Sequence, residues 1–290
     1  TAEMYRTEAA VAQGIEQSSS AREDVVIATK VNYRVDGRIR TPKELESALR
    51  ARLGALNTDY LDVIQVHGLE PADYERVRDE LLPVLERQRR AGTLRWIGVT
   101  EGFRVDRGHV MLQRAIADGC WDVVMVGFNL LNQSARERVL APAQAANIGV
   151  MDMFAVRQAL RDLETVGAHL RERKSAGALP DTIDVKSELA TLARHVGEAA
   201  STLPDLAYRF VLAEPGISTV LVGTGNADHL RDNLASFGRP PLDAAVLGEL
   251  RGVLAGIDVL NGEDGSPGFV PERGVKGMAS RITSKLRRED

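Results

Sequence analysis

The stretch YLDVIQVH, residues Tyr60–His67, decides the fold of this 290-residue chain. It is a short, nearly continuous apolar run rather than an alternation of apolar and polar residues. Such a run is typical of a strand that is buried on both faces, as in a parallel sheet. The stretch therefore predicts an α/β protein, and it ends on a histidine, which is an expensive residue to bury without a partner or a function.

Five other runs have the same character, and helical patterns lie between them. The runs are DVVIATKV (24–31), LRWIGVT (94–100), DVVMVGFN (122–129), IGVMDMFAV (148–156) and STVLVGT (218–224). One helix is predicted to begin at the N-cap Thr41 with Pro42 in its first turn. A second, within DYERVRDELLPVLERQRRAG, is predicted to end at Gly92, and a third to run from Asn226 to Gly238.

The order of these elements favours a closed (β/α)8 TIM barrel over an open doubly wound sheet. An open sheet would normally carry a glycine-rich phosphate loop after its first strand, but the only Gly-x-Gly here is Gly223–Gly225, near the end of the chain. Six strands are two fewer than a barrel needs. We therefore expect the first βα unit, and most of the second, to lie upstream of Thr1.

The predicted domain organisation has a barrel and two additional segments. The barrel covers residues 1–257, with a helical insertion at about 157–203 that exceeds the usual length of a barrel connection. Residues 258–290 are rich in Gly and Pro and then basic, which indicates a C-terminal extension.

Composition excludes several classes of protein. Apolar residues make up 44% of the chain and charged residues 27%, with a net charge of −4. This balance argues against a nucleic-acid partner. One cysteine, Cys120, excludes an internal disulfide framework and suits a reducing compartment. No apolar run is long enough to span a membrane, so we expect a cytoplasmic protein with a small-molecule partner, and the sequence leaves a homo-oligomer open.

Three polar side chains stand at or just past predicted strand ends, where the active face of a barrel lies. They are Tyr5, Lys30 and His67. Each alone is more often structural than functional, but together they form an acid/base set. A nearby cation lowers the pKa of a phenol, so Lys30 can prepare Tyr5 to donate a proton, and His67 can orient a substrate oxygen. No carboxylate–histidine spacing indicates a metal site.

At this point the sequence resembles the aldo-keto reductase family over nearly all of its length to about Ile257. The similar segments are TAEMYRTE, VVIATKV, ALRARLGALNTDYLDVIQVH, AGTLRWIGVT, DVVMVGFNLLNQ and LAYRFVLAEPGISTVLVGTGNADHLRDNLA. The order and spacing of all six segments carry the resemblance.

The resemblance implies a (β/α)8 barrel that reduces a carbonyl group with NADPH or NADH. Tyr5 would be the general acid, Lys30 the cation that lowers its pKa and His67 the orienting donor. The family pairs its Lys with an Asp immediately before the Thr-Ala of the tyrosine motif, a position that falls before Thr1 here. Arg6 stands where the family usually has Gly, which adds bulk beside Tyr5.

The resemblance also implies a set of cofactor-binding residues. Thr100 and Glu101 replace the Ser-Asn pair that holds the carboxamide, Met125 replaces a Gln, and Met153 replaces an aromatic residue that stacks on the nicotinamide. The complete set is Thr100, Glu101, Met125, Met153, Val156, Gly223, Thr224, Gly225, His229, Asp232 and Asn233.

Two questions stay open at the sequence level. Gly225 and His229 occupy the places where an Arg commonly grips the 2′-phosphate of NADPH, so the cofactor is NADPH or NADH. The altered carboxamide contacts also fit an alternative function, a catalytically weak or inactive relative that binds the cofactor as a binding or regulatory protein. The retention of Tyr5, Lys30 and His67 favours the enzyme, a reductase of an aldehyde, ketone or sugar.

Overall fold

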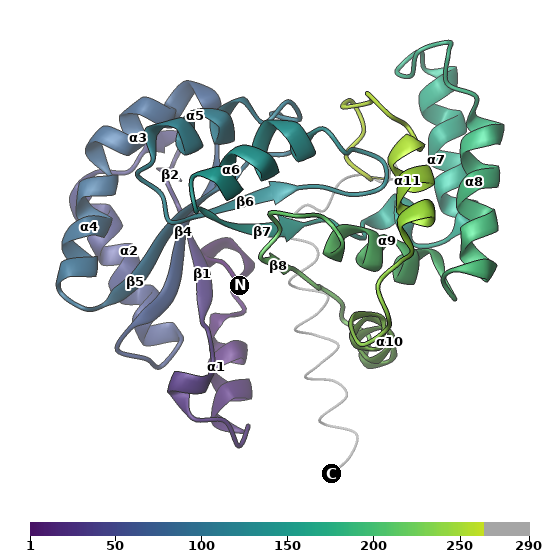
Figure 1. Cartoon of the computed structure of the whole chain (residues 1–290). Coiled ribbons are helices and arrows are strands. Elements are labelled where there is room, and N and C mark those ends of the chain that lie inside the picture. Colours follow the sequence, from purple (N-terminus) through teal and green to yellow (C-terminus); the bar gives the residue numbers. More distant parts are fainter. Residues whose placement is uncertain (264–290) are drawn as a thin grey trace. The chain divides into compact units, whose positions relative to one another are not determined.

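The computed structural model describes residues 1–263, and its ribbon is shown in Figure 1. These residues form two compact units. The first unit contains Thr1–Gly102 and Asp118–Val123, and the second contains Phe103–Ala117 and residues 124–263. Most of the predicted C-terminal extension, residues 264–290, lies outside the described part of the chain.

The first unit contains three parallel strands in the order β1-β4-β5, which are β1 (Ala28–Asn32), β4 (Leu61–Leu69) and β5 (Leu94–Glu101). A short antiparallel pair joins β2 (Arg34–Val35) to β3 (Arg38–Ile39). The helical elements are η1 (Glu3–Tyr5), α1 (Glu8–Glu16), η2 (Arg22–Asp24), α2 (Pro42–Ala55), η3 (Pro71–Asp73), α3 (Tyr74–Glu80) and α4 (Leu82–Arg90).

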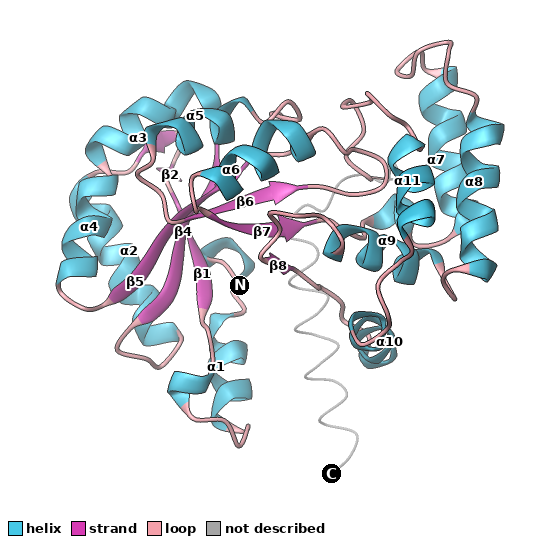
Figure 2. Ribbon diagram, in the orientation of Figure 1, coloured by secondary structure: helices cyan, strands magenta, loops and turns pink. Residues whose placement is uncertain are grey.

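The second unit contains β6 (Val123–Gly127), β7 (Gly149–Met153) and β8 (Thr219–Val220) in that order, and β7 and β8 are parallel. Figure 2 distinguishes its helices from its strands. The helical elements are α5 (Val110–Asp118), η4 (Arg136–Leu140), α6 (Ala141–Ala145), η5 (Gln158–Leu160), α7 (Leu163–Ser175), α8 (Val185–Glu198), α9 (Leu203–Leu212), α10 (Ala227–Phe237) and α11 (Ala244–Gly252).

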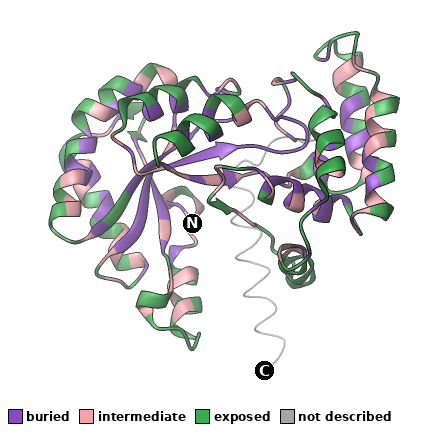
Figure 3. Cartoon of the chain, in the orientation of Figure 1, coloured by how far each residue is buried: buried purple, intermediate pink, exposed green. Residues whose placement is uncertain are grey.

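All six predicted strands are present. The longest of them, β4, shows why unbroken apolar runs predict strands in this chain. In β4 every residue from Leu61 to Val66 is buried, which the unbroken apolar pattern predicts. Figure 3 shows the same contrast, with buried strands and helices whose outer faces are exposed. In the first unit, α2 packs against β1 and α4 packs against β5.

Local chemistry sets the ends of several helices. Thr41 caps α2 in a full capping box, since its hydroxyl accepts from the Glu44 amide and the Glu44 carboxylate accepts from the Thr41 amide. Asn226 caps α10 by accepting from the Asp228 amide, and that helix ends at Gly238. Both predicted helix starts are thus confirmed.

Two local features differ from what the sequence predicts. The helical pattern that leads to Gly92 forms two helices, α3 and α4, which meet at Leu81. Pro83 lies in the first turn of α4, and because proline has no amide hydrogen it starts a helix more easily than it continues one. The β2–β3 hairpin was not predicted, although Asp36 and Gly37 both have positive φ, the signature of a tight Asp-Gly hairpin turn.

The connection from β7 to α9 is mostly helical and consists of η5, α7 and α8. Asp162 caps α7 by accepting from the Thr165 amide, and α8 is kinked near its end, where Gly197 has a φ of 138°. That residues 157–203 are an insertion into a barrel stays a prediction. None of the described helices is long and apolar enough to cross a bilayer.

Gly98 in β5 offers a direct test of sheet packing in the first unit. A Cβ atom at this position would lie 2.5 Å from the backbone oxygen of Val123 and 3.1 Å from Cγ of Gln65. We expect Gly98→Ala to lower the free energy of unfolding by about 2–3 kcal/mol, because backbone cannot easily yield to the added methyl group. Urea denaturation measures the change.

Gly54→Ala is the matched control for this substitution. Gly54 lies in α2, and a Cβ atom added there would have no neighbour within 4 Å. Alanine there should raise stability by about 0.5–1 kcal/mol, because it is the better helix former. A Gly98→Ala protein as stable as the Gly54→Ala protein would contradict the packing described.

Candidate active site

The structure brings Tyr5, Lys30 and His67 together within the first unit. Tyr5 is the last residue of η1, Lys30 lies in β1 and His67 lies near the end of β4. The rings of Tyr5 and His67 meet edge to face with their centroids 5.6 Å apart. The Lys30 ammonium lies 5.4 Å from the centre of the Tyr5 ring. The three groups predicted to act together are therefore neighbours.

Burial sets the electrostatics of this cluster. Lys30 is only 6% exposed, and burial lowers its pKa to about 8. Its ammonium donates to the backbone oxygen of Thr1 at 3.0 Å. Burial, and then the charge of Lys30, lower the pKa of His67 to about 3. At neutral pH Lys30 is thus mainly charged and His67 is neutral, so His67 has one ring N–H to donate.

Two carboxylates, neither of them predicted as a site residue, frame the turn that carries Tyr5. Glu3 accepts from the backbone amide of Asn32 at 2.9 Å and from the Arg40 guanidinium at 2.8 Å. Glu8 accepts from the Thr29 hydroxyl at 2.8 Å, and Arg52 pairs with both carboxylates, at 3.1 Å from Glu3 and 2.6 Å from Glu8.

These carboxylates tie both ends of the Tyr5 turn to β1 and α2. Burial by itself would raise the pKa of Glu3, but the hydrogen bonds from Arg40 and the Asn32 amide lower it below its ordinary value. The pKa of Glu8 is raised by burial, which the Thr29 hydrogen bond and Arg52 only partly offset. Their positions two residues before and three after Tyr5 were visible in the sequence, but their partners were not.

Arg6, directly after Tyr5, has a left-handed backbone with φ of 55° and ψ of 30°. Glycine reaches this region without strain, whereas other L-residues do not. From the sequence, Arg6 is expected to add bulk beside Tyr5. The structure adds a backbone reason for glycine at this position, since Arg6 is exposed and the left-handed turn itself disfavours a side chain.

Gln65 belongs to the same layer of the sheet and was also missed. Gln65 lies two residues before His67 in β4. It pairs in register with Lys30 of β1 on one side and with Gly98 of β5 on the other. It is fully buried, and within the described part of the chain neither atom of its amide has a hydrogen-bond partner. The sequence signal was a polar residue inside an otherwise apolar strand.

The other predicted residues of the first unit are Thr100 and Glu101, at the end of β5. Both are buried. The Thr100 hydroxyl oxygen accepts from the backbone amide of Gly68 at 2.7 Å, which connects the ends of β4 and β5. Thr100 therefore has a structural contact as well as a hydroxyl proton that remains available for donation.

In the second unit, Met125 is buried in β6, while Met153 and Val156 lie half-buried at and after the end of β7. Between them stands Phe154, which was not predicted and has a φ of 74°. The Asn129 amide donates to the backbone oxygen of Phe154 at 3.1 Å and so holds this strained residue.

The remaining predicted cofactor residues of the second unit gather at the start of α10. Gly223, Thr224 and Gly225 belong to the loop between β8 and that helix, and all three are exposed. The Thr224 hydroxyl accepts from the Asn226 amide at 3.1 Å. Along α10, His229 and Asp232 are exposed and Asn233 is half-buried.

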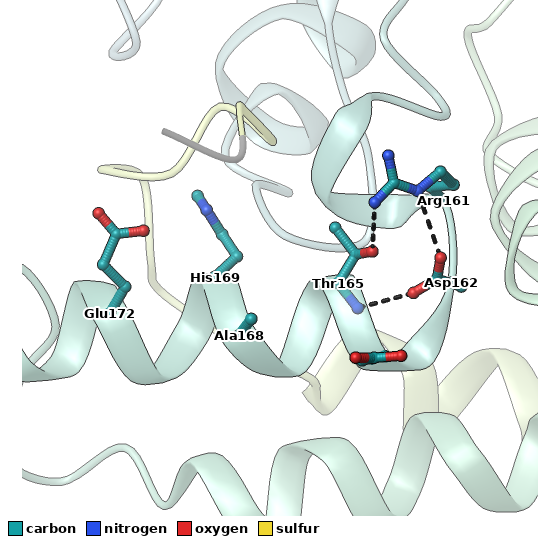
Figure 4. A pocket seen from close by; sticks show the side chains of 7 residues that line it. Arg161, Asp162, Thr165, Ala168, His169 and Glu172 are labelled. Atoms are coloured by element: carbon teal, nitrogen blue, oxygen red, sulfur yellow. Dashed lines mark hydrogen bonds and ion pairs between the residues drawn. The ribbon is translucent and has the colours of Figure 1, made fainter. Parts of the chain in front are cut away.

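A shallow pocket on α7 contains none of the predicted residues (Figure 4). Its lining runs from Arg161 to Glu172. Arg161 donates to the Thr165 hydroxyl at 2.9 Å, and Asp162 accepts from the Thr165 amide at 2.7 Å. These contacts are those of a helix start, so we assign the pocket no function.

Parallel strands with an acid/base cluster at their carboxyl ends define a class of α/β enzymes whose chemistry lies at strand ends. Within that class, residues 1–255 match the profile of the aldo/keto reductase family, so the chain belongs to this family. The family acts as oxidoreductases on carbonyl and alcohol groups, and its fold confirms the predicted (β/α)8 class.

Similar proteins are distant in sequence. L-galactose dehydrogenase of Arabidopsis thaliana is 23% identical over 263 residues, covering 89% of this chain and 79% of that protein. The methylglyoxal reductase DkgB of Salmonella typhi is 33% identical over 120 residues, 40% of each chain. The holo form of aldo-keto reductase AKR11C1 from Bacillus halodurans has a TM-score of 0.64 and 21% identity, over 85% of this chain and 77% of that one.

The depressed pKa of His67 predicts how stability depends on pH. The unfolded chain takes up a proton at His67 below pH 6.5, whereas the folded chain resists protonation down to about pH 3. Stability contributed by neutral His67 is therefore complete above pH 6.5 and falls as the pH drops toward 3. From pH 6.5 to 5 the loss should be about 1–2 kcal/mol, measured by urea denaturation.

His67→Gln should remove most of this slope, because glutamine does not titrate. His229→Gln, a change at an exposed histidine of α10, should leave the slope intact. Equal pH slopes for the wild-type and His67→Gln proteins would show that His67 is not held neutral.

Proposed function

We propose that this protein is an NAD(P)H-dependent reductase of small carbonyl compounds, with Tyr5 as the general acid. The observation that carries the proposal is the contact of Tyr5 with His67, 5.6 Å between ring centroids, beside the buried Lys30 ammonium. A phenol, a buried cation and a neutral imidazole in one cluster make a proton-donating site.

Each member of the cluster has one task in the proposed reaction. As the carbonyl oxygen gains negative charge, the Tyr5 hydroxyl transfers its proton to that oxygen and becomes a phenolate. The adjacent Lys30 charge stabilises the phenolate, which lowers the pKa of Tyr5 and eases the transfer. The neutral His67 donates its N–H to the same oxygen and orients it. In the reverse direction the phenolate removes the alcohol proton.

The residues present fit a nicotinamide cofactor, which supplies the hydride to the carbonyl carbon when it is bound. The backbone of Gly223–Gly225 leads into α10, an arrangement that suits a phosphate group. In the first unit the buried Thr100 hydroxyl retains a proton for a carboxamide oxygen. We propose these residues, with Glu101, Met125, Met153, Val156, His229, Asp232 and Asn233, as cofactor contacts.

The substrate class follows from the family and from two relatives. One is named for a sugar and the other for a small ketoaldehyde. We propose an aldehyde, ketone or sugar substrate for this chain.

Tyr5→Phe tests the general acid. In the intact protein this change removes the hydroxyl but keeps the ring, so turnover should fall about 100-fold or more. Cofactor binding, followed by quenching of NAD(P)H fluorescence, should change little. Tyr60→Phe is the control, because Tyr60 instead packs its ring against Arg22 and Arg95. A Tyr5→Phe protein that turns over substrate as fast as the wild-type protein would refute the assignment of Tyr5 as the general acid.

The alternative function, a cofactor-binding or regulatory protein, is favoured by the Thr100–Glu101 pair. Wild-type protein that quenches cofactor fluorescence yet turns over no member of a carbonyl panel would support that alternative. The same experiment thus separates the two functions.

The cofactor preference is the second test. A bidentate Arg on the 2′-phosphate contributes about 1.5–3 kcal/mol. Because exposed Gly225 and His229 stand in its place, the preference for NADPH over NADH should lie within about tenfold. His229→Arg should raise it, and Leu234→Arg, which adds the same charge elsewhere on α10, should not. A wild-type preference above about 100-fold would contradict this expectation.

A further inference from the structure

Side chains of the second unit hold the segment 258–263, which we name the strap. Arg138 pairs with Asp258 at 2.9 Å and Arg107 donates to the Val259 backbone oxygen at 2.7 Å. Asn132 donates to the backbone oxygens of Asp258 and Leu260. These contacts fix the first half of the strap.

The second half of the strap ends in a carboxylate between two guanidinium groups. One oxygen of Glu263 pairs with Arg157 and also lies 3.4 Å from Nε of Arg104. Its other oxygen accepts from the Asn261 amide at 3.2 Å. Arg157 and Glu263 are largely buried, with side-chain exposures of 15% and 17%. Arg104 is 56% exposed, so the two guanidinium groups form an anion site that is open to solvent on the Arg104 side and is occupied by the Glu263 carboxylate.

The residues around Arg157 hold its guanidinium in place for binding an anion. Its guanidinium carbon lies over the Phe154 ring, 3.9 Å from the ring centre, a contact that restricts where this side chain can move. Phe154 is itself strained, with a φ of 74°, and stacks on Phe103 at 6.2 Å between ring centroids. Backbone strain of this kind is often found at ligand-binding sites.

We propose that Arg157 and Arg104 form a binding site for a phosphate or pyrophosphate group, and that Glu263 is an internal competitor which occupies it. Phosphate carries more charge than a carboxylate and offers more acceptor oxygens to two guanidinium groups. This site stands on contacts in the second unit alone, so it does not depend on the assignment of Tyr5.

The Glu263 side chain can leave the site by rotating about its own bonds while the strap backbone stays in place, because the Gly262 oxygen accepts from the Ala159 amide at 2.8 Å. The contacts of Asp258, Val259 and Leu260 lie upstream of Glu263 and involve other side chains. Between them stands Gly262, with a φ of 79°. A Cβ atom there would lie 3.1 Å from Cβ of Arg157, so glycine permits the strap to approach the site closely.

The proposal is tested by isothermal titration calorimetry at low salt, which measures the affinity of the intact protein for inorganic pyrophosphate. Glu263→Gln removes the competing charge, so pyrophosphate should bind about tenfold more tightly or better than to wild-type. Asp258→Asn is the matched control, since it removes a carboxylate of the same strap that pairs with Arg138 instead. It should change the affinity less than about twofold. Adding Arg157→Met to Glu263→Gln should abolish the gain.

Titration with NADH under the same conditions identifies the source of the phosphate group. Tighter binding of both pyrophosphate and NADH to Glu263→Gln would assign the site to a cofactor phosphate. Tighter binding of pyrophosphate alone would assign it to a separate phosphorylated ligand.

Unchanged pyrophosphate affinity in Glu263→Gln, or a gain that survives Arg157→Met, would overturn the site. So would tighter binding of malonate without tighter binding of pyrophosphate, since the site would then select carboxylates. Turnover is measured separately, so failure of the proposed reductase activity would leave this result intact.

Discussion

The buried ammonium of Lys30 is the constraint on which the rest of the first unit depends. A charge that is 6% exposed is costly to remove from water, and here burial lowers its pKa to about 8. The same charge helps to keep His67 neutral and lies beside the Tyr5 ring. Strand pairing enforces the arrangement, because Asn32 pairs with His67 and Lys30 with Gln65 in the register of β1 and β4.

A second layer of charge holds the chain that faces this cluster. Glu3 lies on η1, Glu8 on α1, Arg40 just before α2 and Arg52 in its last turn, and together they join these elements around the Tyr5 turn. Partly buried pairs of this kind contribute little net stability, but breaking one leaves an unpaired charge. The network therefore specifies where Tyr5 lies more than it strengthens the fold.

The strands and the candidate cluster could be predicted from the sequence for the same physical reason. Strands buried on both faces leave unbroken apolar runs, and the polar residues that end them, such as His67, stand out. The break at Pro83 and the Asp36–Gly37 turn had local signals that were passed over. Contacts between distant residues had none: Glu3 meets Arg40, and Glu263 meets Arg157, only after the chain has folded.

The left-handed backbone at Arg6 has a consequence for how this chain can change by mutation. A strained residue persists only while its surroundings enforce its conformation, and here Glu3 and Glu8 anchor the chain on either side. A non-glycine residue at position 6 is therefore tolerated only while Glu3 and Glu8 keep these contacts. The order in which substitutions arise then matters: the two carboxylates must be in place before glycine is lost, and afterwards neither can be replaced as freely as before.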